Sequence, residues 1–172
     1  SPSASSPVLT GLEATTPGLL WRTAPPDSLQ GEAIAYDMRT PGTGRAAVVD
    51  TVGVVYETGA YGEGLATMFE SSFVAMGGNP PTMWPYSSES DRNDAIISAA
   101  DSAVEEILFA GQTADAAQFM NAIVSLSFDK QIFVTDTAAN TDFIDNSDPT
   151  YFDRVRGAQP GPGSADVSRV YQ

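Results

Sequence analysis

The sequence predicts an α/β domain with a Rossmann-like open parallel sheet and helices on both faces. From about residue 45 onward, short β-branched apolar runs alternate with stretches of amphipathic helical periodicity. The expected strands begin roughly 23 to 31 residues apart, which is the length of a strand with its crossover helix. With 172 residues and 42% hydrophobic content, the chain can bury one core.

The first strand and helix of this pattern follow a loop at residues 40–44. Residues 45–57 (RAAVVDTVGVVYE) contain a β-branched run that ends before Gly59, which is typical of a buried strand. Residues 61–76 place apolar side chains on one helical stripe, and the glycine pair at 77–78 ends that helix. The stripe consists of Leu65, Met68, Phe69, Ser72, Phe73 and Met76.

Two further strand and helix units come next. Residues 82–86 (TMWPY) form a short strand, which Pro85 places near a sheet edge or a strand end. A helix follows at 91–100, then a strand at 106–110 (EILFA) and a helix at 114–125. The side chains of this last helix that are expected to face inward are Ala117, Met120, Ile123 and Val124.

The sheet is completed near the end of the chain. Residues 131–135 (QIFVT) form a strand, residues 138–144 form a short helical turn, and a fifth strand covers 152–158. Ser164 is then expected to cap a last helix.

The first 44 residues follow a different pattern. Residues 1–16 are rich in Ser, Thr and Pro and show little periodicity, and a short strand is expected at 19–23. A helix at 28–38 comes next. A lead of about 16 residues without regular structure is unusual in a compact domain. We therefore expect this opening segment to belong to another body.

The composition excludes several classes of chemistry. The chain has no His and no Cys, which rules out Ser-His-Asp and Cys-His triads, disulfides and the usual zinc and haem sites. Eight Lys and Arg against 22 Asp and Glu give a formal charge of -14, and Lys130 is the sole lysine. Because such a charge repels phosphate backbones, we expect no nucleic-acid partner. No metal and no other cofactor is expected either.

Ligands of open parallel sheets bind beyond the carboxyl ends of the strands. The residues that follow the expected strands therefore form the candidate site. They carry many hydrogen-bonding groups and no basic residue, which suits a neutral or amine-bearing small molecule better than a phosphate. These residues are Glu57, Thr58, Tyr61, Tyr86, Ser87, Gln112, Thr113, Asp136, Thr137 and Gln159.

Three local features have a structural explanation as well as a functional one. The glycines of residues 59–64 (GAYGEG) run in the reverse of the dinucleotide-binding order, and Glu63 would repel a pyrophosphate. They either let a helix start close to its neighbour or place Tyr61 at a pocket. The acidic residues of 142–153 lack calcium-loop spacing and are expected to be solvated. Asp136 either caps a helix or pairs with a ligand ammonium.

Five segments, taken in order and spacing, resemble type 1 periplasmic binding proteins, above all the leucine/isoleucine/valine-binding branch that serves ABC transporters. They are SPSASSPVLT (1–10), WRTAPPDSLQG (21–31), VVYETGAYGEGLA (54–66), ILFAGQTADAAQFM (107–120) and KQIFVTDTAAN (130–140). Such proteins have two α/β lobes joined by hinge crossovers. The resemblance implies that residues 1–26 are a remnant of the first lobe with a crossover, that 27–160 are the second lobe, and that 161–172 are the return crossover with the start of the next helix.

The resemblance also implies a set of ligand-binding residues. Ser3 and Ser5 match positions that hold the α-carboxylate or ammonium of the ligand, and Tyr61 matches an aromatic wall. Asp136 matches the acidic residue that pairs with the ligand ammonium. Gln112 stands where relatives often carry an aromatic residue. That difference favours a more polar ligand or a weaker site over a branched-chain preference.

By this resemblance, the chain is expected to belong to a non-catalytic receptor of an ABC importer. The receptor binds an amino acid of the branched-chain type, or a related small polar solute, and works with a membrane permease. Such a receptor is periplasmic or extracellular, and a lipoprotein anchor is one way in which it is attached to the membrane. The alternative is the ligand-sensing domain of a receptor or signalling protein. A third hypothesis, an enzyme with Asp136 and Glu57 as acid and base, has no nucleophile or metal motif to support it.

Absence of the first lobe has two expected consequences. Closure of two lobes excludes water from the ligand, so this chain alone is expected to bind free amino acids no tighter than millimolar. The apolar residues that a first lobe would cover are expected to drive self-association. These residues are Leu19, Leu20 and Trp21.

Overall fold

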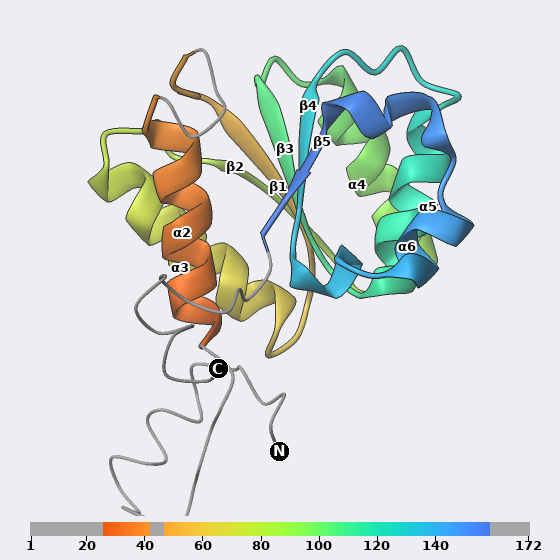
Figure 1. Cartoon of the computed structure of the whole chain (residues 1–172), viewed down its shortest axis with the longest axis horizontal. Coiled ribbons are helices and arrows are strands. Elements are labelled where there is room, and N and C mark those ends of the chain that lie inside the picture. The colour runs from red at the N-terminus through yellow and green to blue at the C-terminus, as the bar shows by residue number, and fades with distance from the viewer. Residues whose placement is uncertain (1–25, 42–46, 159–172) are drawn as a thin grey trace, which may run out of the picture.

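The computed structural model describes residues 26–41 and 47–158, in which five parallel strands form one sheet (Figure 1). The order of the strands is β2-β1-β3-β4-β5. They are β1 (Val52–Glu57), β2 (Thr82–Tyr86), β3 (Glu106–Ala110), β4 (Gln131–Val134) and β5 (Val155–Gly157). Every pair of neighbours runs parallel, which confirms the predicted sheet.

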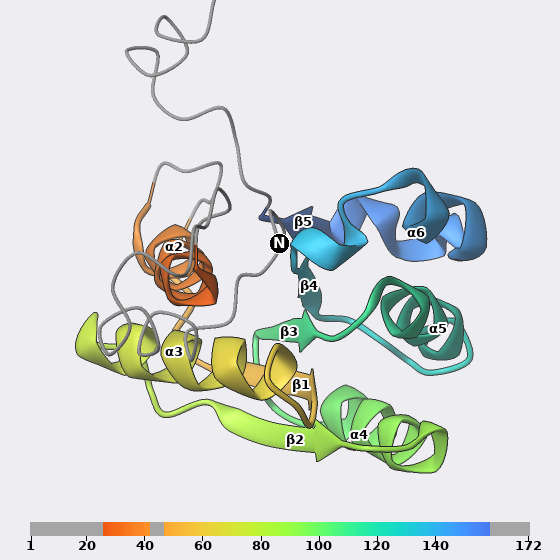
Figure 2. The same cartoon turned by 90° about the horizontal axis from the view of Figure 1, so that it is seen from below.

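Helices cover both faces of this sheet, as Figure 2 shows from below. On one face lie α2 (Asp27–Arg39) and α3 (Gly62–Ala75). On the other face lie α4 (Glu89–Asp101), α5 (Thr113–Ile123) and α6 (Thr141–Asn146). Two 3-10 helices flank α6, namely η1 (Asp136–Ala138) and η2 (Pro149–Arg154).

Alternate residues of the central strands face two separate apolar clusters, as strands buried on both sides require. In β1, Val54 belongs to the cluster that contains Phe69 of α3. Its neighbour Val55 belongs to the cluster that contains Phe119 of α5. Both phenylalanines are completely buried. Truncation of such a ring to alanine costs about 3 to 5 kcal/mol, so each cluster contributes heavily to stability.

Most predicted elements are confirmed within one or two residues of their expected ends. Strand β2, which contains Pro85, is the edge strand that the proline predicts. One expectation for α5 is wrong, because the helix ends at Ile123 and Val124 is 38% exposed. The chain turns there, with the amide of Leu126 donating to the carbonyl of Ile123 at 3.0 Å. The helical periodicity therefore stops one residue before Val124.

The first strand starts later than the sequence predicts. The amides of Asp50 and Thr51 donate to Glu105 Oε2 at 2.6 and 2.9 Å, and the amide of Val49 donates to the carbonyl of Met38 at 2.9 Å. The side chain of Glu105 and the end of α2 thus accept hydrogen bonds from amides that, in a strand, would donate to a neighbouring strand. The described residues 47–51 consequently lie outside β1, and Arg45 lies outside the described residues.

The fifth strand also starts later, at Val155 instead of residue 152. Pro149 begins η2, and the side chain of Asp148 accepts from the amide of Thr150 at 2.9 Å. Proline fixes its own φ and favours the first turn of a helix, so η2 occupies the residues up to Arg154, with a kink at Tyr151 (φ -114°, ψ 18°). The single helical turn expected at 138–144 is divided between η1 and α6.

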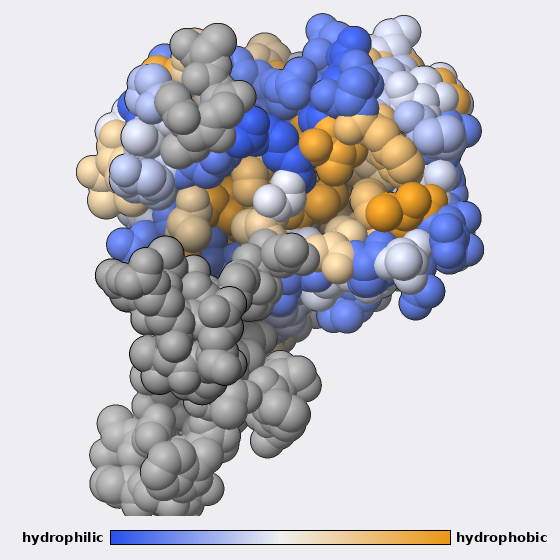
Figure 3. All heavy atoms as spheres, viewed as in Figure 1, coloured by the Kyte–Doolittle hydropathy of each residue, from blue (hydrophilic) through white to orange (hydrophobic). Residues whose placement is uncertain are grey.

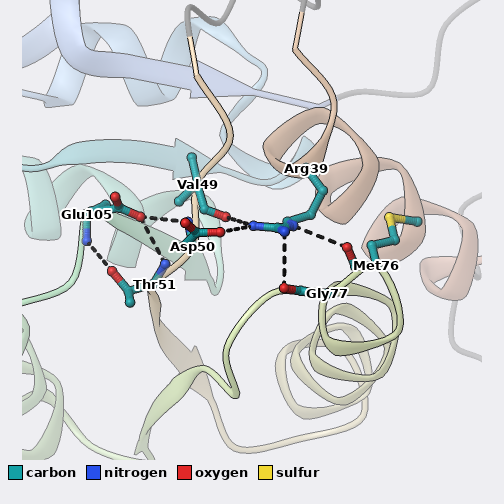
Figure 4. A network of polar contacts seen from close by, with 7 residues as sticks. All are labelled: Arg39, Val49, Asp50, Thr51, Met76, Gly77 and Glu105. Carbon is teal, nitrogen blue, oxygen red and sulfur yellow. Dashed lines mark hydrogen bonds and ion pairs between the residues drawn. The ribbon is translucent and has the colours of Figure 1, made fainter.

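A network of polar contacts joins α2 and α3 to the amino-terminal ends of the strands (Figure 4). Arg39, in the last turn of α2, donates to the carbonyl of Val49 at 2.8 Å and forms an ion pair with Asp50. It also donates to the carbonyl of Gly77 at 3.1 Å, just beyond α3. Gly77 has a φ of 85°, a left-handed conformation that suits glycine and ends the helix. The network holds the edge of the sheet opposite to the candidate site.

Apolar residues gather on the face of the molecule around β5, between α2 and α6 (Figure 3). In the described part of the sheet, β5 is an edge strand with one neighbour, β4. Val155 of β5 is half-buried, and Ile144 of α6 is 57% exposed. This edge is therefore the most apolar part of the surface in that view.

Several predictions concern residues that the structure does not describe. They are the first-lobe remnant, the strand at 19–23, the association through Leu19, Leu20 and Trp21, the cap at Ser164 and the return crossover at 161–172. All of these stay predictions. Within residues 26–41 and 47–158, no helix combines the length and the apolar character that crossing a bilayer requires.

Candidate functional site

The candidate site lies along the carboxyl ends of the strands, where β1 and β3 are neighbours. The helix that follows β1, α3, covers one face of the sheet, and the helix that follows β3, α5, covers the other. Open parallel sheets bind ligands at such a topological switch point. Glu57 ends β1 at this point, and Gln112 comes shortly after β3.

Two of the predicted site residues meet across the middle of this edge. Tyr61 is the residue before α3, and Asp136 is the first residue of η1 after β4. The hydroxyl of Tyr61 donates to Asp136 Oδ1 at 2.8 Å. Because β3 lies between β1 and β4, this hydrogen bond crosses over one strand end. The structure thus brings together two residues that are 75 positions apart.

A close approach at Gly62 allows Tyr61 to take this position. A Cβ at Gly62 would overlap the carbonyl oxygen of Glu57 and lie 2.8 Å from that of Ala110. Helix α3 can therefore begin directly against the ends of β1 and β3 only with glycine here. The structural explanation for the glycine at this turn is confirmed.

Of the two roles considered for Asp136, helix capping is wrong. Thr135 occupies the N-cap position of η1, and Asp136 lies inside the 3-10 helix. The carboxylate is half-buried and accepts from Tyr61 through one oxygen. None of the hydrogen bonds or ion pairs among the described residues uses its other oxygen. A carboxylate oxygen without such a bond has capacity to accept a further hydrogen bond.

The phenol of Tyr61 remains a hydrogen-bond donor. Burial is the largest cause that raises the pKa of Tyr61, and the negative charge of Asp136 raises it further. Hydrogen bonds from Thr135 and Thr137 act in the opposite direction but do not cancel these two causes. Tyr61 is therefore neutral at physiological pH, and it orients Asp136 without adding negative charge to the site.

Side-chain to backbone hydrogen bonds fix the segment that carries Asp136. Thr137 Oγ1 donates to the carbonyl of Gly111 at 2.6 Å, and Thr113 Oγ1 donates to the carbonyl of Thr137. The hydroxyls of Thr135 and Thr137 lie 3.1 Å apart. These bonds join the ends of β3 and β4, so the carboxylate of Asp136 is held in place without a ligand.

Gln112 lies where the sequence places it, at the start of α5 on the edge. Its Nε2 donates to Glu57 Oε2 at 3.3 Å, which is a long hydrogen bond. Gln112 is exposed and Glu57 is half-buried. The switch point therefore carries an amide and a carboxylate instead of an apolar wall.

A buried polar cluster behind this edge is not evident from the sequence. The hydroxyl of Tyr86 donates to Asp115 Oδ2 at 3.1 Å, while Arg92 forms an ion pair with Asp115 and donates to Gln118 Oε1. Arg92 is only 5% exposed. Asp115 and Gln118 are three residues apart on α5, which suggests a shared helix face. Nothing in the sequence shows that α4 brings an arginine to that face.

Alkaline pH is expected to destabilise the chain through Tyr61 and Tyr86. Burial raises the pKa of both phenols well above the ordinary value of 10.0. The folded form therefore keeps protons that the unfolded form releases, so the contribution of these two tyrosines to stability is constant below about pH 10 and falls as the pH rises above it. The loss in Tm between about pH 9 and about pH 11 should be smaller in Tyr61→Phe and in Tyr86→Phe. Equal losses in both variants and the parent chain would contradict this account.

A separate cavity of about 490 Å³ lies between α5 and α6. Its amide groups are largely bonded to the protein itself: Asn121 Nδ2 donates to the carbonyl of Asn146, and Asn146 Nδ2 donates to the carbonyl of Asp142. It shares Thr113 with the candidate site. Within residues 26–41 and 47–158, no group of three acidic side chains is arranged to hold a metal ion.

Comparison with known proteins gives no match to a family model and no significant match to a curated protein. Solved structures do match. A leucine-binding protein from Thermotoga maritima has a TM-score of 0.60 at 22% identity, over 73% of this chain and 35% of its own. An ABC transporter substrate-binding protein from Desulfitobacterium hafniense has a TM-score of 0.61 at 18% identity, and the match covers 77% of this chain and 38% of that protein. A protein assigned to a branched-chain amino acid ABC transporter from Rhodospirillum rubrum has a TM-score of 0.65 at 21% identity, and the match covers 88% of this chain and 44% of that protein.

The chain has the fold of type 1 periplasmic binding proteins. This fold is the one that the five sequence segments imply. The chain spans less than half the length of each of these three structures. The neighbours are described as binding or transporter proteins, and none of the three is described as an enzyme. In the type 1 fold, the Tyr61–Asp136 pair lies at the sheet edge where ligands of open parallel sheets bind.

Proposed function

We propose that this chain is the second lobe of an extracytoplasmic amino-acid receptor that serves an ABC importer. The observation that carries the proposal is the hydrogen bond between Tyr61 and Asp136 at the carboxyl edge of the sheet. A carboxylate that is already oriented, with one oxygen open, suits the ammonium group of an amino acid. The type 1 fold and the transport proteins that share it support the same function.

In this proposal, the ligand is held and released without a chemical step. The hydroxyls of Thr113 and Thr137 donate to backbone carbonyls, and Tyr61 stays protonated. The two threonine hydroxyls are therefore not paired with a base that would make them nucleophiles, and burial keeps the proton on Tyr61 although it donates to Asp136. The edge is therefore suited to reversible binding.

The remaining parts of the receptor are proposed from the resemblance. Ser3 and Ser5, which lie outside the described residues, would hold the carboxylate of the ligand. A first lobe would close over the edge and exclude water, and a membrane permease would accept the ligand from the closed form. The receptor would work in the periplasm or outside the cell.

Titration of the isotope-labelled chain with leucine and with lysine, followed by NMR, tests this proposal. Amide resonances of residues that follow β1, β3 and β4 are expected to shift with a millimolar dissociation constant. The network of Arg39 and Glu105, at the opposite edge, serves as the internal control and should not respond. Shifts confined to that network, or a micromolar affinity of this chain alone, would contradict the proposal.

A further inference from the structure

Two carboxylates frame the candidate site at different strand ends. Glu57 ends β1 and Asp136 follows β4, and β3 separates the two strands. Adjacent strands are about 4.8 Å apart, so the axes of β1 and β4 are about 10 Å apart. Glu57 lies at the switch point of the sheet, where a ligand of this fold class lies, and Tyr61, which also follows β1, reaches Asp136 by a hydrogen bond of 2.8 Å. One small solute can therefore reach both carboxylates.

Each of the two carboxylates accepts a hydrogen bond from a neutral group. Asp136 accepts from the phenol of Tyr61, and Glu57 accepts from the amide of Gln112. None of the ion pairs in the described part of the chain includes either carboxylate. Those ion pairs are Arg39 with Asp50, Arg92 with Asp115, Lys130 with Asp129, and Arg156 with Asp37.

A third carboxylate nearby has a cationic partner, whereas these two have none among the described residues. Asp115, behind the edge, is paired with the buried Arg92. Glu57 acts on the same region: after burial and Asp115, its charge is a further cause that raises the pKa of Tyr86. Two negative charges facing one site repel each other, and a ligand cation at each of them removes that cost.

We infer that the site selects a solute with two cationic groups, one at Asp136 and one at Glu57, which is the chemistry of a basic amino acid. The inference rests on the proposed function, because it needs the α-ammonium at Asp136. The bond from Gln112 occupies only one oxygen of Glu57, so the other can receive the second cation. An apolar side chain at the same place would cover the carboxylate of Glu57 without pairing it, which is unfavourable.

Lysine and norleucine make a sharp test, because they differ only by the terminal ammonium. In NMR titrations of the 172-residue chain, lysine is expected to bind about tenfold more tightly than norleucine. Glu57→Gln should remove this preference, because lysine loses its second ionic partner and norleucine no longer covers an unpaired charge. Asp101→Asn, at the exposed end of α4, changes the net charge by the same amount and should keep the preference.

The outcomes separate this inference from the function on which it rests. Norleucine bound as tightly as lysine, or a lysine preference that survives Glu57→Gln, overturns the inference alone. If neither amino acid binds at the edge, or if Asp136→Asn changes neither affinity, the proposed function fails.

Discussion

Changing Asp136 to asparagine is expected to weaken amino-acid binding by about tenfold to a hundredfold. The substitution keeps the size of the side chain and an oxygen that accepts from Tyr61, so the local fold should persist. It removes the negative charge that pairs with the ligand ammonium. A hydrogen bond to a charged group is worth about 1.5 to 3 kcal/mol, which gives this range of affinity. Because a single lobe leaves the site open to water, the lower end of the range applies to this chain.

Two further variants show whether the effect belongs to the site. Asp145→Asn removes one charge from an exposed position on α6 and should leave the dissociation constant unchanged. Tyr61→Phe keeps the ring but loses the hydroxyl that orients Asp136, so a smaller loss is expected. Equal affinities for Asp136→Asn and Asp145→Asn in the same titration would show that Asp136 does not contact the ligand.

Replacing Asp115 by alanine is expected to lower the free energy of unfolding by about 3 kcal/mol. The substitution leaves Arg92, whose side chain is 6% exposed, without its ion-pair partner. Breaking a buried pair from one side costs about 3 to 5 kcal/mol, and the 21% exposure of Asp115 places the expected cost at the lower limit. Tyr86 also loses the acceptor of its hydroxyl. Urea denaturation measures the change.

A double variant separates the unpaired charge from the loss of packing. Arg92→Met together with Asp115→Ala removes both charges and keeps an apolar chain in the space of Arg92. It should be more stable than Asp115→Ala alone, because no charge stays buried. If Asp115→Ala costs less than about 1 kcal/mol, Arg92 must have found water or another partner.

The elements that could be predicted from the sequence are those whose pattern reflects burial. β1 and β3 are central and buried on both faces, and their unbroken apolar runs show it. The edge position of β2 follows from Pro85. The candidate site could be located for a similar reason, since the ends of parallel strands share one edge. Tyr61 and Asp136 were expected there, and their direct contact depends on the close approach at Gly62.

The features that could not be predicted depend on side chains from elements that are far apart in the sequence. Glu105 accepts hydrogen bonds from the amides of Asp50 and Thr51, and no local pattern shows that a carboxylate 55 and 54 positions away will do so. Arg92 looks like an ordinary surface residue of an amphipathic helix until α5 supplies Asp115. Such contacts are specified by tertiary packing, whereas periodicity reports only which face of an element is buried.

A crystal structure of the chain grown with saturating lysine tests the central claim most directly. We expect the α-ammonium of lysine within hydrogen-bond distance of the Asp136 carboxylate, with Tyr61 still donating to the same group. Lysine bound instead in the cavity between α5 and α6, or with its carboxylate turned toward Asp136, would contradict the account.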